Sequence, residues 1–306
     1  MLFRIPKTNS INESVPGMLN RPALSRQWAF NLFAYRNRLR RVKNPARREV
    51  MGGLAKGLAV IKAFSRDHSA LSLSEIAAAT RMPAATARRC LLTLEELGYV
   101  TRSGRAFLLR PKVLELGAAY LESMDIEHLT KTHLEELARL TGDSAALSVL
   151  DGNDIVYVAR TSVRTLVRLE AHVGSRFPAH VTSMGRVLLA GVGPERLDQF
   201  FRTQKFVALT TQTVTDPKKL RLLIEECRRT GYSAVEDELA YGVVAVAVPV
   251  FDQGGRVVAA LNSSSHSRRA SKTSLVRQRL AMLRKASREI SVELARVPGI
   301  ALSAQT

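Results

Sequence analysis

Residues 71–110 constrain the fold more than any other part of this sequence, because their pattern predicts two short helices, a tight turn between them and a hairpin. Ser72 or Ser74 can cap the first helix, and Glu75 lies near its positively polarised end. Pro83 follows the turn and suits the first turn of a second helix. This order favours a helix-turn-helix.

The second predicted helix, residues 83–98, has an apolar face along its length. Ala87, Leu91 and Leu94 recur at spacings of three or four and predict burial. Leu97 extends this face by one more step. A leucine-faced helical pair is usually only part of a protein core, so the character of the opposite face decides between packing and binding.

That opposite face carries adjacent arginines, threonines and small residues, which favour contact with DNA. Small side chains at Ala84, Ala85 and Ala87 would let the helix backbone lie close to a DNA groove. The residues expected to face DNA are Pro83, Ala84, Ala85, Thr86, Arg88, Arg89 and Thr93.

A basic hairpin follows this helix. Gly98 stops the helix, and residues 99–101 and 107–109 flank Ser103 and Gly104 in a pattern that predicts two strands and a turn. A helix-turn-helix with such a wing lays its second helix in the major groove of double-stranded DNA. Phosphate contacts are expected from Arg102, Arg105 and Arg110.

The net charge is +19, from 46 Lys or Arg against 27 Asp or Glu, which favours a polyanionic partner. Cys90 and Cys227 are the only cysteines and indicate a reducing compartment without a disulfide framework. No apolar run has the length of a membrane span and no signal-peptide pattern follows the first basic residues. We therefore expect a cytoplasmic protein with no membrane partner.

Residues 1–50 lack a clear apolar period and hold 11 basic residues against two acids. They favour a flexible basic arm that adds sequence-independent phosphate contacts. Two other interpretations stay open. One is an organelle-targeting peptide, which the prolines and Trp28 fit poorly, and the other is a translation start at Met18 or Met51.

Further helices are predicted around the helix-turn-helix. One begins at Gly52, with Leu54 and Leu58 on its apolar face, and would cover the back of the unit. A second, residues 111–124, has the place of a linker, and a third covers residues 126–140 before a glycine stop.

The pattern after Gly142 predicts one α+β domain, an antiparallel sheet with helices packed on it. Thr182 can cap one of these helices. The expected strands are residues 145–150, 155–159, 166–173, 243–251 and 257–263, and the expected helices are residues 183–191, 220–230 and 276–297.

Several stretches in order resemble the signatures of the IclR family of transcription regulators. Residues 87–94 and 183–186 are most similar to its Pca- and Pob-type branch, whose members control protocatechuate, 4-hydroxybenzoate and β-ketoadipate pathway genes. The resemblance spans about residues 51–300. The matching segments are residues 53–60, 177–190, 231–233, 236–238 and 247–250.

This resemblance implies a winged helix-turn-helix, a linker helix and a GAF-like effector domain with an antiparallel sheet. It also implies a homodimer or homotetramer, with dimers formed through the DNA-binding domains and tetramers through the effector domains. Ala84 departs from the basic or polar residue that many relatives carry there, so one DNA contact is absent. The expected division is an arm (1–50), a DNA-binding domain (51–110), a linker (111–124) and an effector domain (125–300).

By the same resemblance a set of residues lines the effector pocket. Val235 and Ala245 are apolar where relatives that bind small keto acids have polar groups, which favours a larger or aromatic ligand. The expected lining residues are Leu166, Leu169, Ser183, Met184, Val235, Val243, Ala245, Asn262 and Ser264.

A small organic acid suits this pocket on chemical grounds. The backbone N–H groups of Ser183, Met184 and Gly185 open a predicted helix and can bind a carboxylate, with Gly185 allowing close approach. His180 either binds the effector or holds the turn before this helix. Arg160, Arg164 or Arg168 would supply a cationic partner, unless each is simply solvated on a strand face.

Catalytic and metal motifs are missing. Glu236, Asp237 and Glu238 have no His or Cys at ligand spacing, and we expect them in a solvated loop or an interdomain salt-bridge face. No G-x-S-x-G, Walker or H-E-x-x-H pattern occurs. We expect no catalytic residues, metal or cofactor, and a DNA-binding regulator that responds to an aromatic acid or dicarboxylate. The alternative is a small-molecule-binding or hydrolytic domain with a basic nucleic-acid tether.

Overall fold

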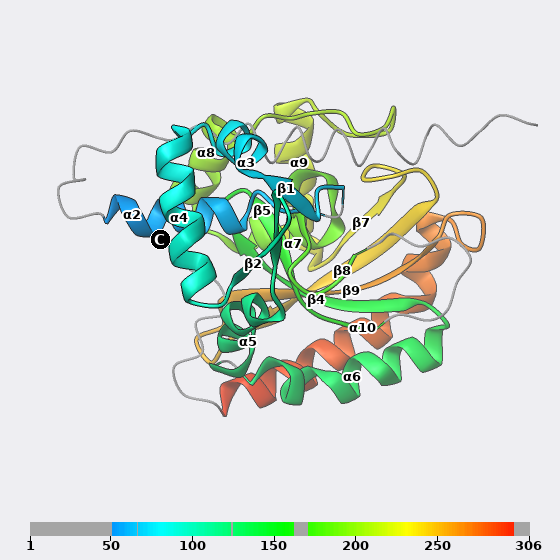
Figure 1. Cartoon of the computed structure of the whole chain (residues 1–306). Helices are drawn as coiled ribbons and strands as arrows, with labels where there is room; N and C mark the ends of the chain where they lie inside the picture. Colours follow the sequence, from blue (N-terminus) through cyan, green and yellow to red (C-terminus); the bar gives the residue numbers. More distant parts are fainter. Residues whose placement is uncertain (1–50, 66, 124, 162–170, 297–306) are drawn as a thin grey trace, which may run out of the picture. The chain divides into compact units, whose positions relative to one another are not determined.

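The computed structural model describes residues 51–65, 67–123, 125–161 and 171–296. The described part is mixed helix and antiparallel sheet, which confirms the predicted α+β class (Figure 1). The predictions made for residues 1–50 and for Arg164, Leu166, Arg168 and Leu169 fall outside the described residues.

The amino-terminal elements form the predicted winged helix-turn-helix. Three antiparallel strands lie in the order β1-β3-β2, and the short strand β1 is an addition to the prediction. Val60, Ile76, Leu91 and Phe107 are buried together at the centre of this unit. Its elements are α2 (Gly52–Ile61), β1 (Ala70–Ser72), α3 (Leu73–Thr80), α4 (Ala84–Glu96), β2 (Val100–Ser103) and β3 (Ala106–Leu109).

The start of α3 follows the predicted capping. The Ser72 hydroxyl accepts a hydrogen bond from the Glu75 backbone N–H at 3.3 Å, and the Glu75 carboxylate accepts one from the Ser72 N–H at 2.8 Å. This reciprocal pair is a capping box, so Ser72 and not Ser74 is the cap. The helix ends at Arg81, whose φ of 53° starts the turn towards α4.

Helix α2 packs against α4 as predicted, with Ile61 and Phe64 against the core of the unit, but its two leucines take no part. Leu54 and Leu58 remain 63% and 45% exposed, whereas Val60 is fully buried. The prediction that these leucines cover the back of the helix-turn-helix is therefore wrong within a single chain, because Val60 makes the core contact in their place.

Residues 111–141 form two helices after a short 3-10 turn. The turn η2 (Pro111–Val113) leads into α5 (Leu114–Ser123), none of whose residues is buried. Helix α6 (Ile126–Thr141) buries most of its predicted face, but Leu140 is 48% exposed, contrary to expectation. It ends as predicted at Gly142, whose φ is 65°.

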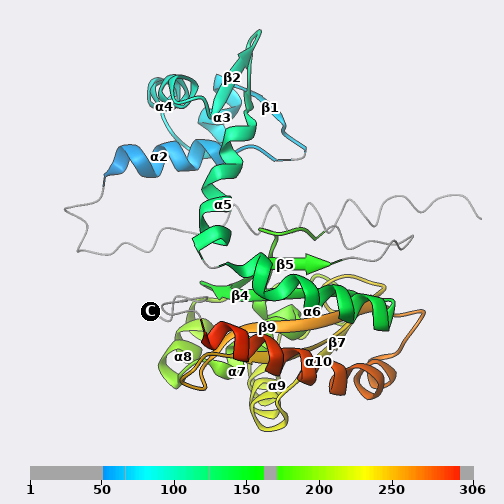
Figure 2. The same ribbon diagram turned by 90° about the horizontal axis from the view of Figure 1, so that it is seen from below.

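The remaining elements build an antiparallel six-stranded sheet in the order β6-β5-β4-β9-β8-β7. Helices α6 and α10 lie side by side on one face, and α7 packs against β8 and β9 on the other (Figures 1 and 2). The elements are β4 (Ser144–Asp151), β5 (Asp154–Thr161), β6 (Arg176–Pro178), η3 (Ala179–Val181), α7 (Ser183–Gly191), α8 (Pro194–Thr203), α9 (Pro217–Thr230), β7 (Ser233–Glu236), β8 (Val243–Phe251), β9 (Val257–His266) and α10 (Lys272–Ala295).

Most of this sheet agrees with the prediction, and its edges do not. The predicted hairpin forms through Gly152, and β8 has the predicted bounds. The predicted strand 166–173 lies mostly outside the described residues, and its described end, 171–173, is not in a strand. Strands β6 and β7 and helix α8 are additions to the prediction. None of the helices in the described ranges combines the length and apolar character that crossing a bilayer requires.

Candidate nucleic-acid interface and effector site

Helix α4 presents the predicted polar face to solvent. Pro83 is its N-cap residue, and Leu91 and Leu94 are buried as expected. Leu97, the C-cap residue of α4, is 51% exposed and does not continue the buried face. Ala87 is fully buried, so only the alanines before it remain available for close approach to a groove.

The arginines of α4 are available for a ligand. Arg88 and Arg89 are exposed, and neither forms an ion pair with any carboxylate in the described part of the chain. The Thr93 hydroxyl donates to the Arg89 carbonyl at 3.1 Å, while Thr86 is half-buried. The outward face therefore combines two free cations with small side chains, as a recognition helix requires.

The wing is a short hairpin whose arginines differ in their contacts. Gly104 turns it with a φ of 59°, and Arg105 beside it is exposed. Arg102 instead pairs with Glu95 of α4 at 3.2 Å and lies over the Phe107 ring at 5.1 Å. The ion pair links the wing to α4. It also holds Arg102, which we expect to contact a DNA phosphate, against the carboxylate of Glu95.

The predicted effector residues gather on the sheet face opposite α6 and α10. Val235 of β7, Ala245 of β8 and Ser264 of β9 lie directly opposite one another in register. Side chains opposite each other on neighbouring strands project from the same face. Val243 lies on the same strand as Ala245, two residues before it, so it belongs to this face as well.

A second row of the sheet brings an amide and a cation onto this face. Asn262 of β9 pairs with Ala247 on one side and Ala146 on the other, and Ala146 pairs with Arg160 of β5. Asn262 is 3% exposed, and its Oδ1 accepts no hydrogen bond within the described residues. A buried acceptor without a donor is costly, so this oxygen is suited to a ligand hydroxyl or water.

The two faces of the sheet differ in side-chain size. The face towards α6 and α10 carries bulky residues such as Leu147, Val246 and Leu261. The opposite face, on which α7 packs, carries small ones. This small-residue face consists of Ala146, Ser148, Ala245, Ala260, Asn262 and Ser264.

Helix α7 is anchored to this face at its first turn. The Ser148 hydroxyl donates to the Met184 sulfur at 3.1 Å. Thr182 caps the helix as predicted, because its Oγ1 accepts the Gly185 N–H at 3.0 Å. The predicted carboxylate contact from the Gly185 N–H is therefore not available, while Ser183 and Met184 remain as candidates.

Gly185 has a packing role in place of the predicted approach to a ligand. A Cβ at this position would lie 2.1 Å from the carbonyl oxygen of Ala179. Only glycine therefore allows the first turn of α7 to contact η3 so closely.

The acidic stretch 236–238 is not a solvated loop. The Glu238 carboxylate accepts a hydrogen bond from Arg186 Nη2 at 2.5 Å and one from the Val214 N–H at 3.2 Å. Arg186 Nε also donates to the His180 carbonyl at 3.2 Å. Arg186 and Glu238 are both buried, because the pair lies inside the domain and joins α7 to the loop after β7.

His180 is placed as a structural residue. Its ring is fully buried, contacts Gln204 through Nδ1 at 3.3 Å and packs edge-on against Phe206. Burial lowers the pKa of His180 to about 4, partly opposed by a hydrogen bond with Val207, so the ring is neutral at pH 7. Within the described ranges no group of His, Cys, Asp or Glu is arranged to hold a metal ion.

Comparisons with known proteins place these features in a family. Residues 53–104 match the IclR helix-turn-helix domain, and residues 118–292 match the family described as bacterial transcriptional regulator IclR C-terminal. The Pca regulon regulatory protein of Pseudomonas putida is 38% identical over 262 residues, which cover 83% of this chain and 90% of that protein.

Two further relatives have names that refer to hydroxybenzoate. The p-hydroxybenzoate hydroxylase transcriptional activator of Acinetobacter baylyi is 32% identical over 247 residues, covering 79% of this chain and 91% of that one. An IclR homologue from Microbacterium hydrocarbonoxydans, solved as a complex with 4-hydroxybenzoate, is 27% identical with a TM-score of 0.69. The match covers 80% of this chain and all of that one.

Proposed function

This chain belongs to the IclR family of bacterial transcription regulators, and on that premise we propose that it controls aromatic catabolism in response to a small carboxylate effector. The effector is an aromatic acid or a dicarboxylate of the β-ketoadipate pathway. The division into residues 51–110, 111–124 and 125–300 as DNA-binding, linker and effector segments is part of this proposal.

One observation carries the effector assignment: the unpaired Oδ1 of buried Asn262 lies in the same row as Arg160. A hydroxyaromatic acid has a hydroxyl that donates to such an oxygen and a carboxylate that pairs with a guanidinium. The small side chains beside Asn262 provide space for a ring. A homologue of known structure binds 4-hydroxybenzoate, which supports the same ligand class here.

DNA binding is assigned to α4 and the β2–β3 wing. The exposed Arg88 and Arg89 would contact base edges or phosphates, and Arg105 would contact the backbone. Effector binding would bias the geometry of α5 and so the spacing of two recognition helices, which is a population shift. We expect half-sites about one or two DNA turns apart, each turn about 10 bp.

A homodimer or homotetramer follows from this mechanism. Met51, Leu54 and Leu58 are large apolar side chains left exposed at or next to α2, and Leu114 is 75% exposed on α5. A second copy of the chain would cover such residues. The double variant Leu54→Glu/Leu58→Glu should then dissociate the oligomer in light-scattering measurements.

Two measurements test the function together. Calorimetric titration of the full chain with 4-hydroxybenzoate and footprinting of the DNA upstream of its own gene should give saturable binding and a protected palindrome. Binding of the acid without any protected DNA would favour a non-regulatory small-molecule-binding protein. Protection without binding would retain the regulator and discard the hydroxybenzoate class.

A further inference from the structure

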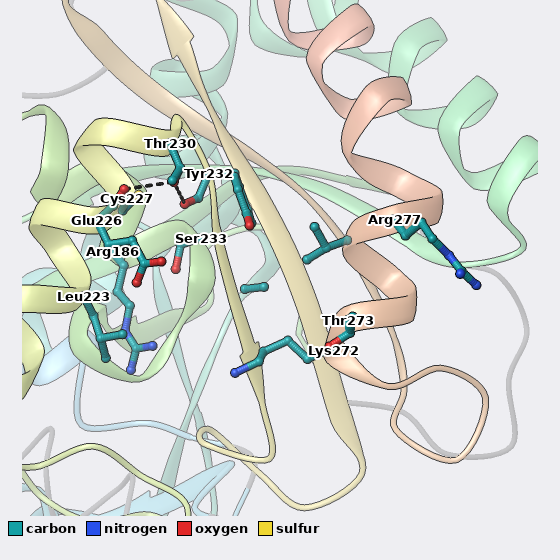
Figure 3. A pocket seen from close by; sticks show the side chains of 12 residues that line it. Arg186, Leu223, Glu226, Cys227, Thr230, Tyr232, Ser233, Lys272, Thr273 and Arg277 are labelled. Atoms are coloured by element: carbon teal, nitrogen blue, oxygen red, sulfur yellow. Dashed lines mark hydrogen bonds between the residues drawn. The ribbon is translucent and has the colours of Figure 1, made fainter.

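A cavity lies at the free edge of the sheet, along β7. It has a volume of about 380 Å³ and runs along β7, with α9 forming one wall and α10 the other (Figure 3). Both Ser233 and Ala234 line it, although successive strand residues project from opposite faces. The cavity therefore wraps around the edge of β7, and one strand, β8, lies between β7 and Asn262 of β9.

Cations reach this cavity from opposite walls. Arg186 extends from the α7 side and Lys272 from the first turn of α10, and both side chains point into the space beside β7 (Figure 3). Lys272 is exposed, and its ammonium group pairs with no carboxylate among the described residues. Glu226 is the single acid in the lining, and Glu238, which pairs with Arg186, lies outside it.

Arg186 and Ser233 each have a hydrogen-bond donor that no protein group in the described part of the chain occupies. Arg186 uses Nη2 for Glu238 and Nε for the His180 carbonyl, which leaves Nη1 without an acceptor in the described part of the chain. Ser233 is 8% exposed, and its hydroxyl likewise has no hydrogen-bond partner there. A hydroxyl that lines a cavity and has no protein partner can donate a hydrogen bond to a ligand there.

Apolar groups separate these polar ones. Leu223 and Cys227 line the α9 wall, and Val276 lines the α10 wall. Burial raises the pKa of the Cys227 thiol to about 12, so this thiol is protonated and acts as an apolar surface. A ligand that fits has a charged group at each end and a short hydrocarbon chain between them.

We propose that this cavity is a second ligand site, which binds an aliphatic dicarboxylate between Lys272 and Arg186. One carboxylate pairs with the Lys272 ammonium group, and the other accepts hydrogen bonds from Arg186 Nη1 and the Ser233 hydroxyl. The methylene groups contact Leu223 and Val276. Because Arg186 also holds Glu238, a ligand here would act on the loop after β7 and modulate the response to the first effector.

The test uses glutarate as the probe and calorimetry on the full chain. Glutarate should bind the native chain saturably, and Lys272→Met should weaken that binding by about tenfold or more, because a charged hydrogen bond is lost. Lys219→Met is the matched control, since Lys219 is an exposed lysine of α9 outside the cavity. This control should stay within about twofold of the native affinity.

A second variant and a competition experiment locate the bound glutarate. Thr273→Trp, which fills the cavity from its rim, should abolish glutarate binding without changing the thermal midpoint of unfolding. Glutarate and 4-hydroxybenzoate should bind without competition, because Ala247 of β8 lies between Ser233 of this cavity and Asn262.

Four results would overturn the second site: no glutarate binding, equal loss in both lysine variants, competition with 4-hydroxybenzoate, or equal affinity for inorganic phosphate. None of them bears on DNA binding, and competition would place glutarate in the hydroxybenzoate site without removing that site, so the proposed function is decided by its own measurements.

Discussion

Arg186 and Glu238 form an ion pair, with 2.5 Å between Nη2 and Oε2, whose side chains are only 3% and 10% exposed. The pair joins the first turns of α7 to the loop that follows β7. The Thr213 hydroxyl donates to the backbone carbonyl of Glu238 at 2.7 Å, so the loop that holds Thr213 is also bonded to Glu238. Helix α7 and the two loops that hold Val214 and Glu238 therefore meet at one charge pair.

Removing one partner should destabilise the fold strongly. Arg186→Met leaves Glu238 buried without its cation, and a loss of about 3–5 kcal/mol in the free energy of unfolding is expected. Urea denaturation measures it. The double variant Arg186→Met/Glu238→Leu should recover part of the loss, because no unpaired charge is left buried. A double variant as unstable as the single one would show that charge pairing is not what matters at this position.

The α4 arginines should contribute directly to DNA affinity. Arg89→Ala is expected to weaken binding to a cognate promoter by about 1–3 kcal/mol if it reads a base. Electrophoretic mobility shift at fixed salt measures the change. Arg288→Ala removes an exposed arginine from α10 and is the control for net charge. Unchanged affinity in Arg89→Ala would remove this residue from the interface.

The Arg102–Glu95 pair should limit DNA affinity. Glu95→Gln releases Arg102 for a phosphate and removes an acid near the wing, so affinity for DNA should rise and depend more steeply on salt. The gain should disappear in the variant Glu95→Gln/Arg102→Ala. A gain that persists in the double variant would mean that general repulsion by Glu95, and not its hold on Arg102, is responsible.

The helix caps and buried strands are predictable from sequence because their signals are local. Ser72 and Thr182 cap α3 and α7 from within four residues, and the apolar run of β8 indicates a central strand by itself. The Arg186–Glu238 pair joins residues 52 apart in sequence, and nothing in either segment alone specifies that contact. The acids in 236–238 therefore have the pattern of a solvated loop.

The edge strands of the sheet are not predicted from the sequence, for a different reason. Strand β7 has four residues of mixed polarity, and one of its two buried positions is the polar Ser233, so no apolar alternation marks it. Helix α8 does carry usable signals, a proline at its first position and Leu197 and Phe200 three apart. The prediction that Leu97 belongs to the core is wrong, because the buried face of α4 stops at Leu94.

Asn262 should control effector binding without affecting DNA binding. Asn262→Leu removes the unpaired acceptor and adds apolar volume, so affinity for 4-hydroxybenzoate should fall by about tenfold or more, in line with the loss of a buried hydrogen bond. Ser263→Ala is the control, because this neighbour on β9 pairs with Ala145 and Val246 on the opposite face of the sheet. Calorimetry on both variants makes the comparison. Equal losses would point to general damage to β9.

Acidification should destabilise the fold through His180. The pKa of His180 is about 4 in the folded chain against 6.5 for an unperturbed histidine, because burial disfavours the charged ring. Between these values the unfolded chain binds a proton that the folded chain does not, so stability falls as pH drops from about 6.5 towards 4. The His180 contribution is a loss of about 2 kcal/mol at pH 5 relative to pH 7. Urea denaturation gives the difference in the free energy of unfolding between pH 7 and pH 5, and we expect this difference to be smaller by that amount in His180→Asn than in the native chain. The variant His128→Asn, at an exposed position, should show the same difference as the native chain. An unchanged difference in His180→Asn would mean that this ring is protonated in the folded protein.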